Sequence, residues 1–433
     1  MRNKKYFCMS FVAAVMLIFM CQTALADVTP GDVIDKSNWE KVEGLLPESI
    51  VNWVKKGDYI LNIGSLNYDP LEYNRFLTAE SLKKNIGKYE LDETDNIIDI
   101  KTGKLPDFIA GIPFPEVDDK DPGAATKIAY NRSYYQALQG HISMPYQVIF
   151  VGRKGREREV DALWVQITLD GFEGAKDIPN PDAYMRRVIS LFLQPFDVAG
   201  TAQMAWRFRA AKSDLNFAYL PSMRRVRRTT PANRSDGIVG SDICYDDAWG
   251  YDGKVSDFKW KLIREQEALL PFRDKNPITI VQNKNGGWET TKDIKDTKFG
   301  FETKGWTGVP WAPTNCIWVK RTVQVMELRS RNPYYNFGIQ YIWLDKESQT
   351  GLLKIVCDRA GDYWKTMILG QGGLISKDKE SMKLLTFTLQ QNIDERSDHC
   401  SIIKDCSKRN KWIFFHTMDV NSFTLGGFPA FCK

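Results

Sequence analysis

The sequence predicts an α+β protein dominated by a large antiparallel β-sheet. Short segments rich in Val, Ile, Trp, Tyr and Phe recur along the 433-residue chain and are separated by Gly, Pro, Asp or Asn, a pattern that is typical of strands joined by turns. The connections are short, so they favour antiparallel hairpins over βαβ units. After the N-terminus, only two segments show the clear spacing of a helix.

The N-terminus has the three parts of a secretory signal peptide. These parts are the positive residues Arg2, Lys4 and Lys5, the apolar residues 7–20, and the small residues Ala24 and Ala26. We therefore expect cleavage after Ala26 and export to a bacterial periplasm, with an uncleaved signal anchor as the alternative. Residues 27–433 are predicted to form a single domain, with a helical segment at its start and a less certain C-terminal extension from about residue 380.

The two predicted helices cover residues 47–57 and 180–195. The first begins with a proline, which is favoured at the start of a helix, and ends with a glycine suited to a C-terminal cap. In the second, Tyr184, Val188 and Phe192 recur at helical spacing between two prolines. The predicted strands cover residues 59–63, 147–151, 160–169, 202–209, 215–220, 258–263, 317–328, 339–344, 352–357, 384–389 and 412–415.

The cysteines suggest a disulfide. Six of them follow the signal peptide, and an even number in an oxidising compartment is typical of disulfide bonding. Cys400 and Cys406 are the predicted pair, which would close a small loop. For Cys244, Cys316 and Cys357 a small buried thiol is an equal alternative, and the pairing of these three and of Cys432 stays open.

Charge and motifs exclude several function classes. The formal net charge is +5 and falls to +2 without the signal peptide, which does not indicate a nucleic-acid-binding protein. The chain lacks the nucleophile elbow, HExxH, P-loop and EF-hand motifs. It has three histidines, too few for most triads or histidine metal sites. We therefore expect no catalytic residues, no metal and no cofactor; a secreted hydrolase with paired carboxylates is the remaining enzymatic alternative.

Residues 242–257 are the best candidate for a cation or sugar site. Five aspartates lie in this run together with Tyr245, Trp249 and Tyr251. Their spacing matches no calcium loop. The alternative is a polar connection between strands that carries no ligand.

Four arginines form a second candidate site. Arg224, Arg225, Arg227 and Arg228 follow a predicted strand and a proline turn. The guanidinium group suits bidentate contact with phosphate or carboxylate. The cluster could therefore contact a lipid headgroup or an acidic partner, or it could pair with Asp and Glu on neighbouring strands.

Several motifs, spread over most of residues 28–370, resemble one bacterial periplasmic family of unknown function that is similar to outer-membrane lipoprotein-sorting proteins. The motifs are Gly111-Ile112-Pro113-Phe114-Pro115 with Pro122-Gly123 and Asn131, residues 219–228 with the four arginines, the acidic residues 242–262, and residues 319–327 and 332–345. The resemblance implies the fold of the LolA/LppX lipoprotein carriers: a strongly curved, incompletely closed antiparallel sheet wrapped over helices, with an apolar cavity. It carries no catalytic residues with it.

The expected function is that of a periplasmic carrier or chaperone. Its cargo would be lipid-like: a lipid, the acyl chains of a lipoprotein, or another hydrophobic compound. The resemblance also implies association with a resistance-nodulation-division (RND) type permease and an outer-membrane protein. The alternative is a non-catalytic accessory or scaffold protein of such a transport system.

Four aromatic residues are predicted to line the cargo cavity. Trp206 and Phe208 are two residues apart, as are Phe217 and Tyr219, so each pair lies on one face of its strand. Placing Phe208 opposite Phe217 also places Trp206 opposite Tyr219 and leaves a tight turn at 212–213. The alternative is that the four rings are ordinary core between sheet and helix.

Overall fold

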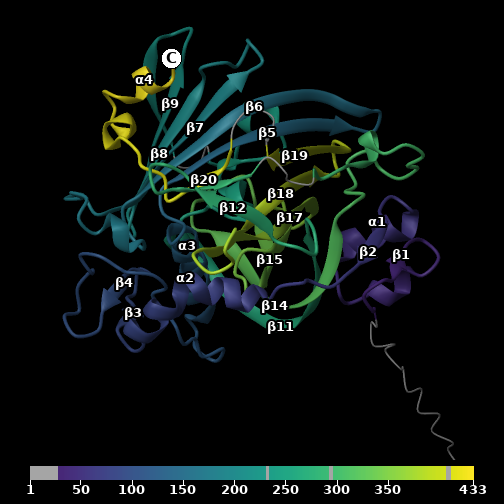
Figure 1. The fold of residues 1–433 in the computed structure, drawn as a ribbon, viewed down its shortest axis with the longest axis horizontal. Helices are drawn as coiled ribbons and strands as arrows, with labels where there is room; N and C mark the ends of the chain where they lie inside the picture. The colour runs from purple at the N-terminus through teal and green to yellow at the C-terminus, as the bar shows by residue number, and fades with distance from the viewer. Residues whose placement is uncertain (1–27, 231–233, 292–295, 406–410) are drawn as a thin grey trace, which may run out of the picture.

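The computed structural model describes residues 28–230, 234–291, 296–405 and 411–433. The predicted signal peptide and Cys406 lie outside these residues. Figure 1 shows a strongly curved sheet with a few helices beside it. None of the helices in the described ranges is long and apolar enough to cross a membrane.

Thirteen strands form one continuous antiparallel series. In spatial order they are β10 (Arg225–Thr229), β9 (Leu215–Leu220), β8 (Ala202–Phe208), β7 (Tyr184–Gln194), β6 (Gly155–Thr168), β5 (Ile142–Gly152), β19 (His399–Asp405), β18 (Lys383–Asp394), β17 (Tyr363–Ser376), β16 (Leu352–Cys357), β15 (Ile339–Asp345), β14 (Ile317–Ser330) and β11 (Phe258–Phe272). Neighbouring strands are twisted relative to one another, and over so many strands this twist accumulates into curvature.

The sheet is partly ring-like but does not close into a barrel. At one end, β11 returns to β17 where Phe272 pairs with Gln371, and β12 (Ile278–Gln282) runs parallel to β17. At the other end, β10 pairs only with β9 within the described residues. The predicted α+β fold with an incompletely closed antiparallel sheet is therefore confirmed.

The remaining strands are short. β1 (Val33–Ile34) and β2 (Leu61–Ile63) extend the sheet beside β14, while β13 (Trp288–Thr290) and β20 (Ile413–Phe414) connect β12 to β5. A separate hairpin consists of β3 (Tyr89–Leu91) and β4 (Ile97–Asp99). The strands β18 and β19 lie in the middle of the series, so residues after 380 contribute central parts of the sheet.

Four α-helices accompany the sheet: α1 (Glu48–Lys56), α2 (Pro70–Lys84), α3 (Ala124–Ala137) and α4 (Phe428–Phe431). The prediction for α1 is confirmed, with Pro47 directly before it and Gly57 in the left-handed conformation after it (φ 81°). Sequence analysis missed α3, because nearly all of its residues are buried and a helix buried on all sides has no apolar–polar periodicity.

The predicted helix at residues 180–195 is wrong, because this segment contains β7. The Asn180 side chain accepts from the Tyr184 amide at 2.9 Å and donates to the Tyr184 carbonyl at 2.7 Å, so it closes a turn instead of capping a helix. Both neighbouring strands then pair with β7. Val188 and Phe192 are four residues apart, and this spacing places them on one face of a strand as well as of a helix.

The sheet has a buried core on each of its two faces. On one face, α1 and residues before it pack against β14, β17 and β18. On the other face, Trp249 and Tyr251 pack against apolar residues of β15, β16, β17 and β18. We call this second face the inner face, and we call residues 238–251, which lie over it, the covering segment.

Candidate binding site

The covering segment has little regular structure. It contains two short 3-10 turns, η4 (Ile238–Gly240) and η5 (Tyr245–Gly250). Val239 (φ 45°) and Trp249 (φ 55°) adopt the left-handed conformation, which is costly for a β-branched or bulky residue. Such strained positions are concentrated at ligand-binding and switch segments.

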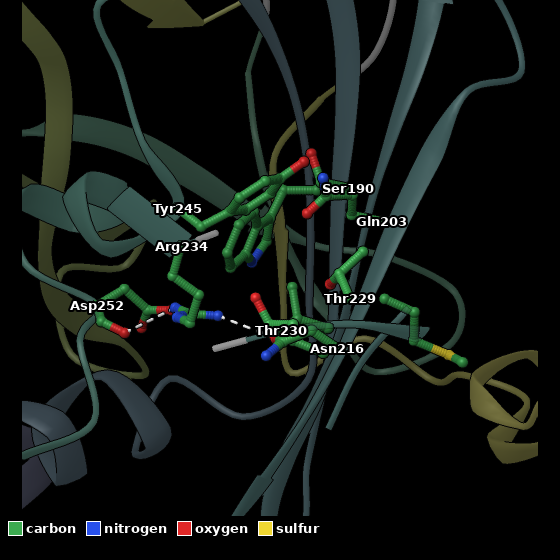
Figure 2. Close-up of a pocket in the computed structure, with 12 residues that line it drawn as sticks. Ser190, Gln203, Asn216, Thr229, Thr230, Arg234, Tyr245 and Asp252 are labelled. Carbon is green, nitrogen blue, oxygen red and sulfur yellow. Dashed lines mark hydrogen bonds and ion pairs between the residues drawn. The ribbon is translucent and has the colours of Figure 1, made fainter. Parts of the chain in front are cut away.

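Two adjoining cavities lie between the covering segment and the inner face, each with a volume of about 50 Å³. Both are lined by Trp164 of β6, Ser190 of β7 and Tyr245 of the covering segment. One cavity is mainly apolar and is otherwise lined by side chains that include Met144, Trp249, Phe387, Ile403 and Trp412. The other is more polar and extends along β8, β9 and β10 to Asn216 and Thr229 (Figure 2).

Three buried donors in the lining of the polar cavity lack a hydrogen-bond partner among the described residues. They are Trp164 Nε1, Asn216 Nδ2 and Tyr245 Oη. Burial raises the pKa of the Tyr245 hydroxyl well above its usual value, so this group keeps its proton. Buried polar groups without partners are rare in proteins and need an explanation.

Buried ion pairs fix the chain around these cavities. Asp252 pairs with Arg186 of β7 and lies 3.5 Å from Arg234. The Arg234 Nε lies 2.5 Å from Asp246 Oδ1. On the covering segment itself, Asp247 pairs with Lys354 of β16, and Asp242 accepts hydrogen bonds from β19.

These pairs account for most of the acidic run that sequence analysis singled out. Its carboxylates face arginines, a lysine and a histidine of the protein itself. No group of three or more His, Cys, Asp or Glu side chains that could hold a metal occurs in the described part of the chain. Most of the run therefore serves to attach the covering segment and the residues after it to the sheet.

The four predicted aromatics share one face, but their register differs from the predicted one. Met204 lies opposite Phe217, and Ala202 lies opposite Tyr219, a shift of four residues that preserves the face. The predicted tight turn does not form. Instead a longer loop, residues 209–214, joins the strands, and Arg207 Nε lies 2.8 Å from Asp214 Oδ2 within the hairpin.

These rings lie on the opposite face from the cavities, which we call the outer face. The rings of Trp206 and Phe217 are 5.0 Å apart. Tyr219 contacts Phe428 of α4 at 6.2 Å, and Phe423 belongs to the same buried cluster. The C-terminal residues therefore cover this face (Figure 1), and the role of the four rings in cargo binding stays a prediction.

The four arginines are exposed, and none forms an ion pair with another described residue. The alternative that they pair with neighbouring carboxylates is therefore not seen. Thr229 lies opposite Asn216 and Arg227 opposite Ala218, so Arg225, Arg227 and Thr229 share the face on which the polar cavity lies. Arg228 lies on the outer face, and Arg224 lies in the turn before β10 (φ 49°).

The predicted Cys400–Cys406 disulfide is not present, since Cys400 is a free and buried thiol. Cys406 lies outside the described residues. Residues 399–405 form strand β19 instead of a small loop.

The sheet defines the class of the protein: an α+β protein with a curved, incompletely closed antiparallel sheet. A family model, DUF1329 (protein of unknown function), matches residues 33–425. The chain belongs to this family, so the predicted family resemblance is confirmed. No curated protein matches the chain.

The solved structures that are similar to the chain include the following three. A domain from Vibrio parahaemolyticus, named for outer membrane lipoprotein sorting, has 14% identity and a TM-score of 0.48, covering 71% of this chain and 100% of its own. A DUF1329 family protein from Desulfovibrio piger has 14% identity and a TM-score of 0.45, with 70% and 98% covered. A LolA superfamily protein from Nitrosomonas europaea has 10% identity and a TM-score of 0.38, with 68% and 96% covered.

Proposed function

We propose that the protein is a non-catalytic carrier that binds lipid-like hydrophobic cargo in the cell envelope, in the periplasm. The observation that supports this most is the apolar cavity between the inner face and the covering segment. Its lining is dominated by Met, Ile, Phe and Trp side chains with a few polar groups, the composition that is typical of sites for small hydrophobic ligands.

Cargo would enter by displacing the covering segment. The cavities are far smaller than the roughly 300–1,000 Å³ of typical ligand sites, so binding of cargo would have to enlarge them. Burying an acyl chain gains about 0.8 kcal/mol per CH₂, which a long chain can use to offset the cost of moving the segment. The strained residues Val239 and Trp249 lower the cost of a rearrangement there.

The arginines would contact an anionic headgroup. Beside them lie exposed apolar side chains at neighbouring turns: Phe196 (96% exposed) between β7 and β8, Leu220 at the end of β9, and Met223 between β9 and β10. Both turns are at the same end of the sheet, because the start of β8 pairs with the end of β9. Exposed apolar groups next to unpaired arginines suit a surface that combines acyl chains and anionic groups.

The same arginines would also suit an acidic protein partner. This favours the second candidate function, an accessory or scaffold protein of an RND-type permease or an outer-membrane transport system. The two functions differ in one observable, because a scaffold carries no lipid of its own.

Native mass spectrometry of the protein isolated from its own envelope tests the proposal. We expect a population with the added mass of one lipid-like molecule. A variant that fills the apolar cavity, Ala248→Leu, should lose this adduct while keeping its melting temperature. Lipid-free protein from several preparations, or an adduct unaffected by Ala248→Leu, would contradict cargo binding at the inner face.

A further inference from the structure

We propose that the lining shared by the two cavities binds the polar end of the cargo, and that this end is the carboxylate or ester of an acyl chain. The inference rests on the proposed function and adds the chemistry of the ligand. The apolar cavity would take the hydrocarbon chain. The polar cavity, on the other side of Trp164 and Tyr245, would take its oxygen atoms.

The unpartnered groups come from three separate elements. Trp164 belongs to β6, Asn216 to β9 and Tyr245 to the covering segment, yet all three line one cavity. In Figure 2 the ring of Tyr245 extends from the covering segment toward Ser190 and Gln203 on the strands. Folding has thus buried three donors together without giving them acceptors among the described residues.

The chemistry of these groups selects an oxygen acceptor. An indole N–H and an amide NH₂ can only donate, and the Tyr245 hydroxyl stays protonated because burial raises its pKa. Two nearby acceptors are already engaged: the Ser190 hydroxyl lies 2.8 Å from that of Tyr146, and Asn216 Oδ1 accepts from Arg234. The oxygens of a carboxylate or an ester can accept two or more hydrogen bonds, so a single end group can satisfy several of the donors.

The surrounding lining sets the direction in which the chain binds. Phe387 and Trp412 lie only in the apolar cavity, whereas Asn216 and Thr229 lie only in the polar one. An acyl chain that reached from Trp412 past Trp164 would place its oxygens beside Tyr245. Arg225 and Arg227, which precede Thr229 on β10, lie on the same face of this strand as Thr229.

Three probes with a chain of sixteen carbons test the inference: palmitate, methyl palmitate and hexadecane. Each competes with a fluorescent hydrophobic probe for the full-length mature protein. The test variant is Tyr245→Phe, which removes only the hydroxyl. The matched control is Tyr251→Phe, because the Tyr251 hydroxyl is also buried and unpartnered among the described residues but lines neither cavity.

We expect Tyr245→Phe to weaken binding of one or both oxygen-bearing probes by roughly five- to tenfold, as for one lost hydrogen bond. Hexadecane binding and the melting temperature should not change, and Tyr251→Phe should leave all three affinities unchanged. Weaker binding of palmitate alone would show that the site binds a carboxylate. Weaker binding of both palmitate and methyl palmitate would show that it binds the carbonyl of an ester or acid.

Two results overturn the inference. One is equal affinity of Tyr245→Phe and the wild type for all three probes, which would mean that water satisfies the donors. The other is an equal loss for all three, including hexadecane, which would mean that the variant disturbs the cavity itself. If the wild type binds none of the probes, the proposed function fails; if it binds all of them equally, only the inference about the polar end fails.

Discussion

The two faces of strands β6–β9 differ in how completely they are packed. On the outer face, the aromatic side chains form edge-to-face contacts and are covered by the C-terminal residues. On the inner face, two small cavities are surrounded by ion pairs and by donors that have no partner in the described part of the chain. The aromatic face is thus closely packed, and the two cavities lie on the face that carries the ion pairs.

The difference has a physical cause. Apolar side chains are flexible in how they pack, so an aromatic face can be filled by any complementary apolar segment. Buried ion pairs require fixed geometry and leave gaps wherever their partners do not fit. The inner face therefore combines buried ion pairs that attach the covering segment with incomplete packing beneath that segment.

Replacement of Phe217 by alanine gives the largest expected effect and tests whether the outer face is filled core. Phe217 is buried, and we expect Phe217→Ala to lower the free energy of unfolding by roughly 3–5 kcal/mol, as for other buried aromatic side chains. Urea denaturation measures the loss. Phe196→Ala is the control, because Phe196 is 96% exposed and its loss should leave stability unchanged.

A different outcome would favour the prediction made from sequence. If Phe217→Ala kept its stability but lost bound lipid, the four rings would line the cargo cavity. The C-terminal residues would then have to leave this face when cargo binds.

Asp252→Asn tests the rigid attachment on the inner face. Asp252 interacts with Arg186, Arg207 and Arg234, and loss of its charge leaves buried guanidinium groups without compensation. We expect a loss of about 3 kcal/mol in the free energy of unfolding, within the range for a broken buried ion pair. Asp197→Asn is the control, because its pair with Arg158 lies at the surface and should contribute less than about 1 kcal/mol.

Hydrogen exchange shows whether the effect is local. Residues 238–251 should lose protection in Asp252→Asn before the rest of the sheet does. Uniform loss of protection over all strands would contradict the assignment of these ion pairs to the covering segment.

Substitution of the arginines of β10 tests whether the proposed binding surface of the inner face extends to this edge strand. Arg227→Gln should weaken binding to vesicles that contain anionic lipid by roughly fivefold, equivalent to about 1 kcal/mol per arginine. The effect should shrink at high salt, because the charges are exposed and screened. Arg228→Gln is the matched control on the opposite face of the same strand, and an equal loss there would show that the face does not matter.

Local signals made part of the fold predictable from the sequence. The proline and glycine that bound α1 act on their own helix, so its ends could be predicted. Strand β9 was predicted with its observed ends, because Gly, Pro or Asp turns bound such apolar segments. The register of β8 and β9 depends on the loop that the Arg207–Asp214 pair closes. The alternation of side chains along each strand predicts which face they share, but it does not predict the register.

The site was less predictable, because distant segments assemble it. Residues 242–257 attracted attention as an acidic run with aromatic residues, but their partners lie on β7, β16 and β19. No local pattern reveals that these carboxylates are neutralised. Tyr245 was visible within the run, whereas the cavity that it lines exists only once β6 and β9 lie beneath it.

The smallest expected effect is a pH dependence of the covering segment. Asp242 Oδ2 lies 2.5 Å from His399 Nδ1 and accepts from Ser401 Oγ at 2.7 Å. The hydrogen bond to Asp242 raises the pKa of His399 above its usual value, although burial opposes it, and Glu157 and Asp394 add to the rise. Protonated His399 therefore stabilises the folded state, and this contribution is complete below a pH of about 6.5 and is lost as the pH rises through the folded-state pKa.

We therefore expect hydrogen exchange in residues 238–251 to accelerate modestly, after correction for the intrinsic pH dependence of exchange, as the pH rises above about 6.5. The underlying change in free energy should stay below about 1 kcal/mol, because the pair is partly accessible to solvent. His399→Gln keeps a donor for Asp242 but does not titrate, so its corrected exchange should be independent of pH. His416→Gln is the control, since burial lowers the pKa of His416 and it lies outside the covering segment. A pH response that survives in His399→Gln would place the titrating group elsewhere, and the covering segment would then open independently of Asp242.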